Sequence, residues 1–222
     1  QDDDGDLLAL EDALQEWQQA GRQLLLLLDE VDRLIERATE FNDVLDLWRV
    51  FGQTPTLNIV TASRLPLAEL VRLGNLVSPF HNIFIEQCLG LLAEADWRGL
   101  VREGFESRGL PLPPGALPWI AEVAGGHPFY TQMAADVLYQ WRRDHAAEPD
   151  YAALTSVFAA QAHATLKSLW EHLTAREQAA LRAPRPAPHT VAALEHRGLL
   201  RNGRPFSTIF AQGIREGWWE EK

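Results

Sequence analysis

The sequence predicts an α/β protein in which a partial parallel sheet is followed by a largely helical part and a small C-terminal domain. Two short apolar runs, Leu24–Leu28 and Leu57–Ala62, flank a stretch with helical spacing. Strands that alternate with helices indicate a parallel sheet, because each crossover helix returns the chain to the same end of the sheet. After Leu89 the pattern is helical, and no strand is indicated again until Leu199.

Composition places the chain among globular proteins that fold without disulfides. Its 222 residues are 46% hydrophobic and 23% charged, which excludes a largely disordered or collagen-like chain. The single cysteine, Cys88, cannot form a disulfide within the chain. The sequence has no basic and apolar leader, and no apolar run approaches the roughly 20 residues that a membrane helix needs. We therefore expect a cytoplasmic protein with no membrane partner.

The elements before Leu89 follow from spacing and from helix breakers. Apolar residues from Leu7 to Trp17 recur at helical spacing, and Gly21 ends that helix. The five leucines at 24–28 suit a parallel strand buried on both faces, because the run is short and is flanked by a stop signal and by charge. Helical spacing returns over residues 31–51, and we expect two more strands, at 57–62 and 82–86.

Helices dominate the remainder of the chain. They are expected at about 91–108, 115–124, 127–145 and 151–162, with a stiff proline-rich connector at 110–114. Two further helices follow Leu166, and a short one covers Thr190–Arg197. The segment from Gly198 to Phe206 predicts a small hairpin, since its centre is the Asn202-Gly203 pair that two-residue hairpin turns favour.

Acidic residues follow the leucine strand directly. Ligands of open α/β sheets bind in the crevice at the carboxyl ends of parallel strands, where Asp29 and Glu30 would emerge. There the first acid can hold a hydrated magnesium ion and the second can orient or deprotonate an attacking water. A second interpretation stays open, in which both acids simply begin the next helix and complement its dipole.

Two other segments can carry chemistry, and each also has a purely structural interpretation. Ser63 and Arg64 end the second strand, where they could contact a terminal phosphate or simply lie on the surface. The sequence Gly125-Gly126-His127-Pro128 makes a defined helix start that lets the backbone approach a ligand closely. Two interpretations of this segment stay open: a planar base could pack against His127 and Pro128, or the segment could be an ordinary turn between helices.

Taken together, these segments resemble the P-loop ATPases of the AAA+ and STAND superfamily, in particular the bacterial and archaeal branch with a winged-helix domain after the ATPase. Leu24–Glu30 resembles the Walker B strand and Leu57–Arg64 the sensor-1 strand. Ser78–Phe84 is similar to the segment that enters the last sheet strand. Gly126–Phe129 resembles the Gly-x-Pro motif of the helical lid, and Leu199–Glu216 the wing and closing helix.

The resemblance implies three parts and a set of roles. Residues 1–88 would be the C-terminal half of an ATPase core, 89–162 a helical lid and 163–222 a winged-helix domain. ATP and Mg²⁺ would be the cofactors. The implied roles are Asp29 as the magnesium ligand, Glu30 and Arg64 as catalytic residues, Ser63 as a contact of the γ-phosphate, and His127 with Pro128 as the lining of the adenine.

One motif of these ATPases is missing from the 222 residues. A Walker A loop needs Gly-x-x-x-x-Gly-Lys-Ser/Thr, whose amides cradle the phosphates, and neither Lys167 nor Lys222 follows a glycine. In such ATPases this loop precedes Walker B by many tens of residues. We therefore expect a portion of a longer ATPase, inactive by itself, in preference to a degenerate protein that has lost the loop.

The resulting hypothesis is an ATP-dependent regulatory or signalling switch. Its partners would be a missing N-terminal half of the ATPase, an effector domain or further copies in a homo-oligomer. The alternative is a non-catalytic interaction or DNA-binding module that acts through the winged helix. DNA is the less favoured partner, because the net charge of the chain is −11 and residues 163–222 carry only 9 basic against 6 acidic residues.

Overall fold

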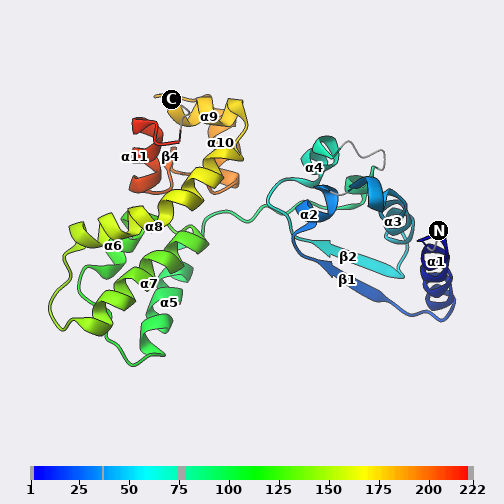
Figure 1. Ribbon diagram of the computed structural model, residues 1–222, viewed down its shortest axis with the longest axis horizontal. Coiled ribbons are helices and arrows are strands. Elements are labelled where there is room, and N and C mark those ends of the chain that lie inside the picture. The colour runs from blue at the N-terminus through cyan, green and yellow to red at the C-terminus, as the bar shows by residue number, and fades with distance from the viewer. Residues whose placement is uncertain (1–2, 37, 75–78, 220–222) are drawn as a thin grey trace. The chain divides into compact units, whose positions relative to one another are not determined.

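The computed structural model describes residues 3–36, 38–74 and 79–219. The chain forms two compact units, one up to residue 87 and one from residue 88 onward (Figure 1). The sequence predicts a boundary between the ATPase half and the helical part after residue 88. The assignment of residues 89–162 as a lid and of 163–222 as a winged helix stays a prediction.

The first unit is built around two parallel strands. Its elements are α1 (Asp3–Gln19), β1 (Leu24–Leu28), α2 (Val31–Glu36), α3 (Ala38–Phe51), β2 (Leu57–Thr61), α4 (Leu67–Leu73) and the short 3₁₀ helix η1 (Phe80–Ile83). Strands β1 and β2 pair in parallel, from Leu24 opposite Leu57 to Leu28 opposite Thr61. The predicted strand–helix–strand order is confirmed, although the expected helix over 31–51 is divided into α2 and α3.

One face of this sheet carries the core of the unit. Leu14 of α1, Phe51 of α3 and Leu57 of β2 are buried together, and Leu24 and Leu26 pack against them. The opposite face is open, because Leu25, Leu27 and Val60 are 60%, 67% and 56% exposed. The prediction that the leucine strand is buried on both faces is therefore wrong for this chain. Burial on both faces needs a helical layer on each side of the sheet, and α1 and α3 lie against one side.

The third strand, expected at 82–86, does not form. Phe80–Ile83 is a 3₁₀ turn that follows Pro79, and the residues from Phe84 to Ala93 have no regular structure. Phe80 is fully buried against Trp48 and Phe84, so the ring fixes a turn where the sequence pattern suggested a strand. Ile85 is 99% exposed. Ser78, which belongs to the expected segment, lies outside the described residues.

The second unit is helical apart from one hairpin. Its elements are α5 (Glu94–Glu106), α6 (Ala116–Ala124), α7 (Pro128–Asp144), α8 (Tyr151–Glu171), α9 (Ala175–Arg182), α10 (Pro188–His196), β3 (Leu200–Arg201), β4 (Arg204–Pro205) and α11 (Thr208–Glu216). Asp150 begins α8 by accepting hydrogen bonds from the N–H groups of Ala152 and Ala153. Helix α8 continues past residue 162, so the predicted boundary at 163 falls inside a helix.

A continuous hydrophobic core joins the helices of this unit to its C-terminal segment. The core extends from Trp97 of α5 through Phe158 of α8 to Phe210 of α11 and Trp219. Trp219 is buried in this core although it follows the last helix. Among the described residues, no helix has both the length and the apolar character needed to cross a membrane.

The predicted hairpin is confirmed. Strands β3 and β4 are antiparallel, with Leu200 opposite Pro205 and Arg201 opposite Arg204. Asn202 and Gly203 both have positive φ, at 53° and 73°. This left-handed pair is the geometry of the tight hairpin turn that the Asn-Gly sequence indicates.

Candidate functional site

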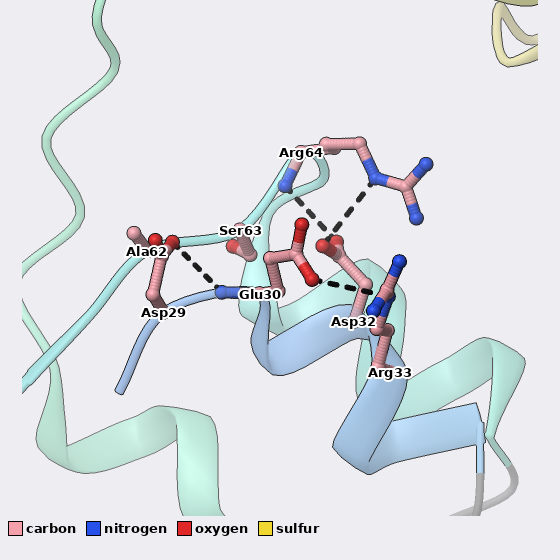
Figure 2. A pocket seen from close by; sticks show the side chains of 7 residues that line it. All are labelled: Asp29, Glu30, Asp32, Arg33, Ala62, Ser63 and Arg64. Carbon is pink, nitrogen blue, oxygen red and sulfur yellow. Dashed lines mark hydrogen bonds and ion pairs between the residues drawn. The ribbon is translucent and has the colours of Figure 1, made fainter.

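The carboxyl ends of β1 and β2 bring the four predicted strand-end residues into one pocket. The parallel ladder continues past the strands, since the N–H of Ala62 donates to the carbonyl of Leu28 at 2.8 Å and the N–H of Val31 to the carbonyl of Ala62 at 3.1 Å. The two polar segments therefore leave the sheet side by side. A cavity of about 330 Å³ lies between them (Figure 2), lined by Asp29, Glu30, Asp32, Arg33, Ala62, Ser63 and Arg64.

Asp29 and Glu30 form a sharp corner between β1 and α2. Asp29 is exposed, and its Oδ1 accepts a hydrogen bond from the N–H of Glu30 at 2.8 Å. Glu30 has a φ of 52°, a left-handed conformation that a residue with a side chain rarely adopts. Strained backbone of this kind gathers at functional sites. Both residues are exposed, so their carboxylates are accessible at the mouth of the pocket.

The Glu30 carboxylate has a neighbour of opposite charge. Its Oε2 lies 3.1 Å from Nε of Arg33, one helical turn later, and both side chains are largely exposed. An exposed ion pair of this spacing contributes between 0 and about 1 kcal/mol. Glu30 can therefore exchange Arg33 for a ligand or a water at little cost.

Asp32 joins the two sides of the pocket, although it is not among the site residues predicted from the sequence. Its Oδ1 accepts from the backbone N–H of Arg64 at 3.0 Å, and its Oδ2 lies 3.4 Å from Nε of Arg64. The sequence does contain a signal for Asp32, because it is an acid in the first turn of the helix that follows β1, directly after the apolar Val31. Ser63 Oγ donates to the carbonyl of Leu65 at 2.7 Å, so the hydroxyl fixes the same loop.

The donor set of the pocket suits a magnesium ion bridged to phosphate. Magnesium prefers oxygen ligands, keeps several waters and typically takes only one or two protein carboxylates alongside substrate phosphates. Asp29 offers one carboxylate whose Oδ1 is partly used by the N–H of Glu30. Within the described residues, no group of three or more histidine, cysteine, aspartate or glutamate side chains could hold a metal by itself.

His127 and Pro128 belong to the second unit, and the strand-end pocket of the first unit is lined without them. They begin helix α7, with His127 at the N-cap and Pro128 at the first helical position. The His127 ring lies 4.7 Å from the ring of Tyr130 and 5.2 Å from that of Phe206, between centroids. Burial lowers the pKa of His127 to about 4, so the ring is neutral at pH 7.

Comparison with known proteins gives one finding. The family model described as "Novel STAND NTPase 2" matches residues 1–188, which include the strand-end pocket and the start of α7. Searches of curated proteins and of solved structures found no match. Because the match covers most of the chain and contains the whole pocket, the chain belongs to the novel STAND NTPase 2 family.

Proposed function

We propose that this chain is the Walker B, lid and winged-helix portion of an ATP-dependent regulatory switch. The observation that carries the proposal is the convergence of Asp29, Glu30, Ser63 and Arg64 on one cavity at the carboxyl ends of two parallel strands. Membership of a STAND NTPase family supports nucleotide as the ligand. The cavity is lined by both acidic and basic side chains. This suits a metal-bound phosphate chain, whose cation would face the acids and whose anionic oxygens would face an arginine.

The acidic side of the pocket would hold the metal and the water. Magnesium supplies charge neutralisation of the phosphates when it is bound. Asp29 would hold the ion through one carboxylate oxygen, as magnesium sites of this kind require. Glu30 would release Arg33 and orient the attacking water, accepting its proton at a carboxylate oxygen. Glu30 is exposed at the left-handed corner before α2, so its carboxylate is open to a ligand or a water.

The other side of the pocket would bind the γ-phosphate. The Arg64 guanidinium carries positive charge at the end of β2, where it would stabilise the negative charge that develops on the transferred phosphoryl group. Ser63 would orient the same loop and lie next to the phosphate. In this assignment Glu30 and Arg64 are the catalytic residues and Ser63 is a binding residue.

The site needs a phosphate-binding loop that these 222 residues do not contain. We propose that a segment of the protein outside them supplies the Gly-x-x-x-x-Gly-Lys-Ser/Thr loop. The chain alone would then bind ATP weakly and hydrolyse none, because one arginine cannot replace a cradle of amides and a lysine. The AAA+ assignment and a cytoplasmic location belong to the same proposal.

The second unit would convert nucleotide binding into a signal. His127 and Pro128 would line the adenine, and the neutral His127 ring suits packing on a planar base. Residues 89–162 would act as the lid and 163–222 as a winged helix, so that ATP fixes one arrangement of the units and hydrolysis releases it. The output would reach an effector domain or further copies of the chain.

Direct DNA binding by the proposed winged helix has less support. The exposed positions of α10, the candidate recognition helix, are Pro188, His189, Ala192, Ala193, Glu195 and His196. None of them is arginine or lysine, the side chains that dominate contacts with phosphate and with guanine.

The test compares magnesium-dependent ATP binding by the protein encoded by the complete gene with binding by the 222-residue chain. We expect binding and slow hydrolysis in the complete protein only. Glu30→Gln in the complete protein should abolish hydrolysis and retain binding. Absence of binding in both proteins would remove the nucleotide assignment, and equal hydrolysis by wild type and Glu30→Gln would remove the role of Glu30.

A further inference from the structure

Asp32 is 4% exposed, and it is the one buried charged residue among those whose side-chain burial the structure describes. A carboxylate removed from water is costly unless hydrogen bonds and an opposite charge replace the lost hydration. Glu30, the acid two positions earlier, cannot supply that compensation. The partners come from the opposite side of the pocket, 32 residues later.

Both oxygens of Asp32 engage the same residue in two different ways. Oδ1 accepts the backbone N–H of Arg64, which fixes the path of the loop after β2. Oδ2 contacts Nε of the Arg64 side chain, which fixes the direction of the guanidinium. A single carboxylate therefore orients both the main chain and the side chain of Arg64.

This arrangement leaves the anion-binding end of Arg64 outside the ion pair. The Arg64 side chain is 63% exposed, although its partner is buried. Figure 2 shows the guanidinium extending past Asp32, with its two terminal nitrogens directed away from that carboxylate. Those two nitrogens can still donate a pair of hydrogen bonds to two oxygens of a phosphate. Arg64 can thus bind an anion without leaving Asp32.

We propose that Asp32 is the positioning residue of the strand-end pocket. It fixes Arg64 in advance for an anionic ligand and ties the loop after β2, which carries Ser63 and Arg64, to the helix that follows Asp29 and Glu30. The identity of the anion as the phosphate chain of a nucleotide rests on the proposed function. The orientation of Arg64 by Asp32 does not depend on that proposed function.

A competing role for Asp32 is purely local. Acids in the first turn stabilise a helix through its dipole, and Asp32 lies in the first turn of α2. That role would require no contact with Arg64 and would not change how Arg64 binds a ligand. The two roles therefore differ in what happens to Arg64 when Asp32 is substituted.

The first experiment follows the Arg64 Nε–H signal by ¹⁵N NMR in the 222-residue chain. The signal is assigned with the Arg64→Lys variant, in which it should be missing. Asp32→Asn keeps the size of the side chain and removes its charge. It should speed exchange of the Arg64 Nε–H with water by about tenfold or more, since a charge-assisted hydrogen bond is lost.

Asp46→Asn is the matched control, because Asp46 Oδ1 lies 3.4 Å from Nε of Arg49 in α3 of the same unit. It should leave the Arg64 signal unchanged. An Arg64 signal that is equally protected in wild type and Asp32→Asn overturns the proposal.

The second experiment measures Mg-ATP affinity in the complete protein for Asp32→Asn, Arg64→Ala and the double variant. We expect each single change to weaken binding about tenfold, and the double variant to match Arg64→Ala, because Asp32 acts through Arg64. Purely additive losses overturn the positioning role even if nucleotide binds. If the wild type binds no nucleotide, the proposed function fails, and the Arg64 signal alone decides whether Asp32 positions that residue.

Discussion

Gly125 at the end of α6 lies against the backbone of Phe206, which precedes α11. A Cβ placed on Gly125 would be 1.5 Å from the carbonyl oxygen of Phe206. The same end of α6 is tied to α11 by the Thr208 hydroxyl, which donates to the carbonyl of Glu122 at 3.2 Å. The predicted lid and the C-terminal segment are therefore in direct backbone contact within one unit.

Gly125→Ala should strongly destabilise the second unit. The methyl group cannot share space with the Phe206 carbonyl, and the φ of 57° at Gly125 adds the cost of a left-handed alanine. Overpacking and the backbone term together predict a loss of about 2–4 kcal/mol in the free energy of unfolding. Urea unfolding followed by tryptophan fluorescence measures it.

Gly109→Ala is the matched control, since Gly109 has a φ of 67° and a Cβ added there would meet nothing within 4 Å. It should cost only the backbone term, about 1–2 kcal/mol. Equal losses for the two alanine variants would contradict the close approach of Gly125 to Phe206.

Glu30→Gly should give a more stable protein than Glu30→Ala, by about 0.5–1 kcal/mol. Both changes remove the carboxylate, but only glycine adopts the φ of 52° without steric cost. At Asp29, which is not among the described residues with positive φ, the order should reverse, because glycine there only adds flexibility to the unfolded chain. Chemical unfolding of the four variants checks both orders. A preference for alanine at position 30 would refute the strained corner.

A structural feature of this chain could be predicted from the sequence where neighbouring residues determine it. The Asn202-Gly203 hairpin was predicted because the turn geometry is set by the two residues themselves. Glu30 and Arg64 could each be placed at a strand end, because each closely follows a short apolar run in the sequence.

Features that depend on distant partners could not be predicted in this way. The contact of Asp32 with Arg64 spans 32 positions and leaves no periodic signal in the sequence. The failed strand at 82–86 has the same origin, because the packing of Phe80 on Trp48 decides its conformation. The open face beside Leu27 likewise depends on which helices cover the sheet, and strand composition does not specify them.

The second unit should lose stability between about pH 6.5 and pH 4 through His127. Its folded-state pKa is about 4, and the unfolded value is 6.5. The unfolded chain therefore takes up the proton first as the pH falls, so the stability is fully present above pH 6.5 and is lost progressively down to pH 4. The shift corresponds to a loss on the order of 3 kcal/mol.

His127→Phe keeps an aromatic ring beside Tyr130 and Phe206 and removes the titrating group. Unfolding free energies measured from pH 7 to pH 4 should fall less steeply in this variant than in the wild type. Identical slopes for the two proteins would show that His127 is not held neutral by burial.

The open face of the sheet offers a test of whether further chain covers it in the complete protein. In the 222-residue chain, Leu27→Ala should cost less than about 1 kcal/mol, since that side chain is mostly exposed. The same substitution at the buried Leu57 of the neighbouring strand should cost about 2–5 kcal/mol. Differential scanning calorimetry of both variants measures the contrast.

In the protein encoded by the complete gene, the cost at Leu27 should rise toward that at Leu57, because a segment that supplies the phosphate loop would extend and cover the sheet. A cost at Leu27 that stays small there would mean that this face is not covered, and it would argue against a complete ATPase sheet around the strand-end pocket.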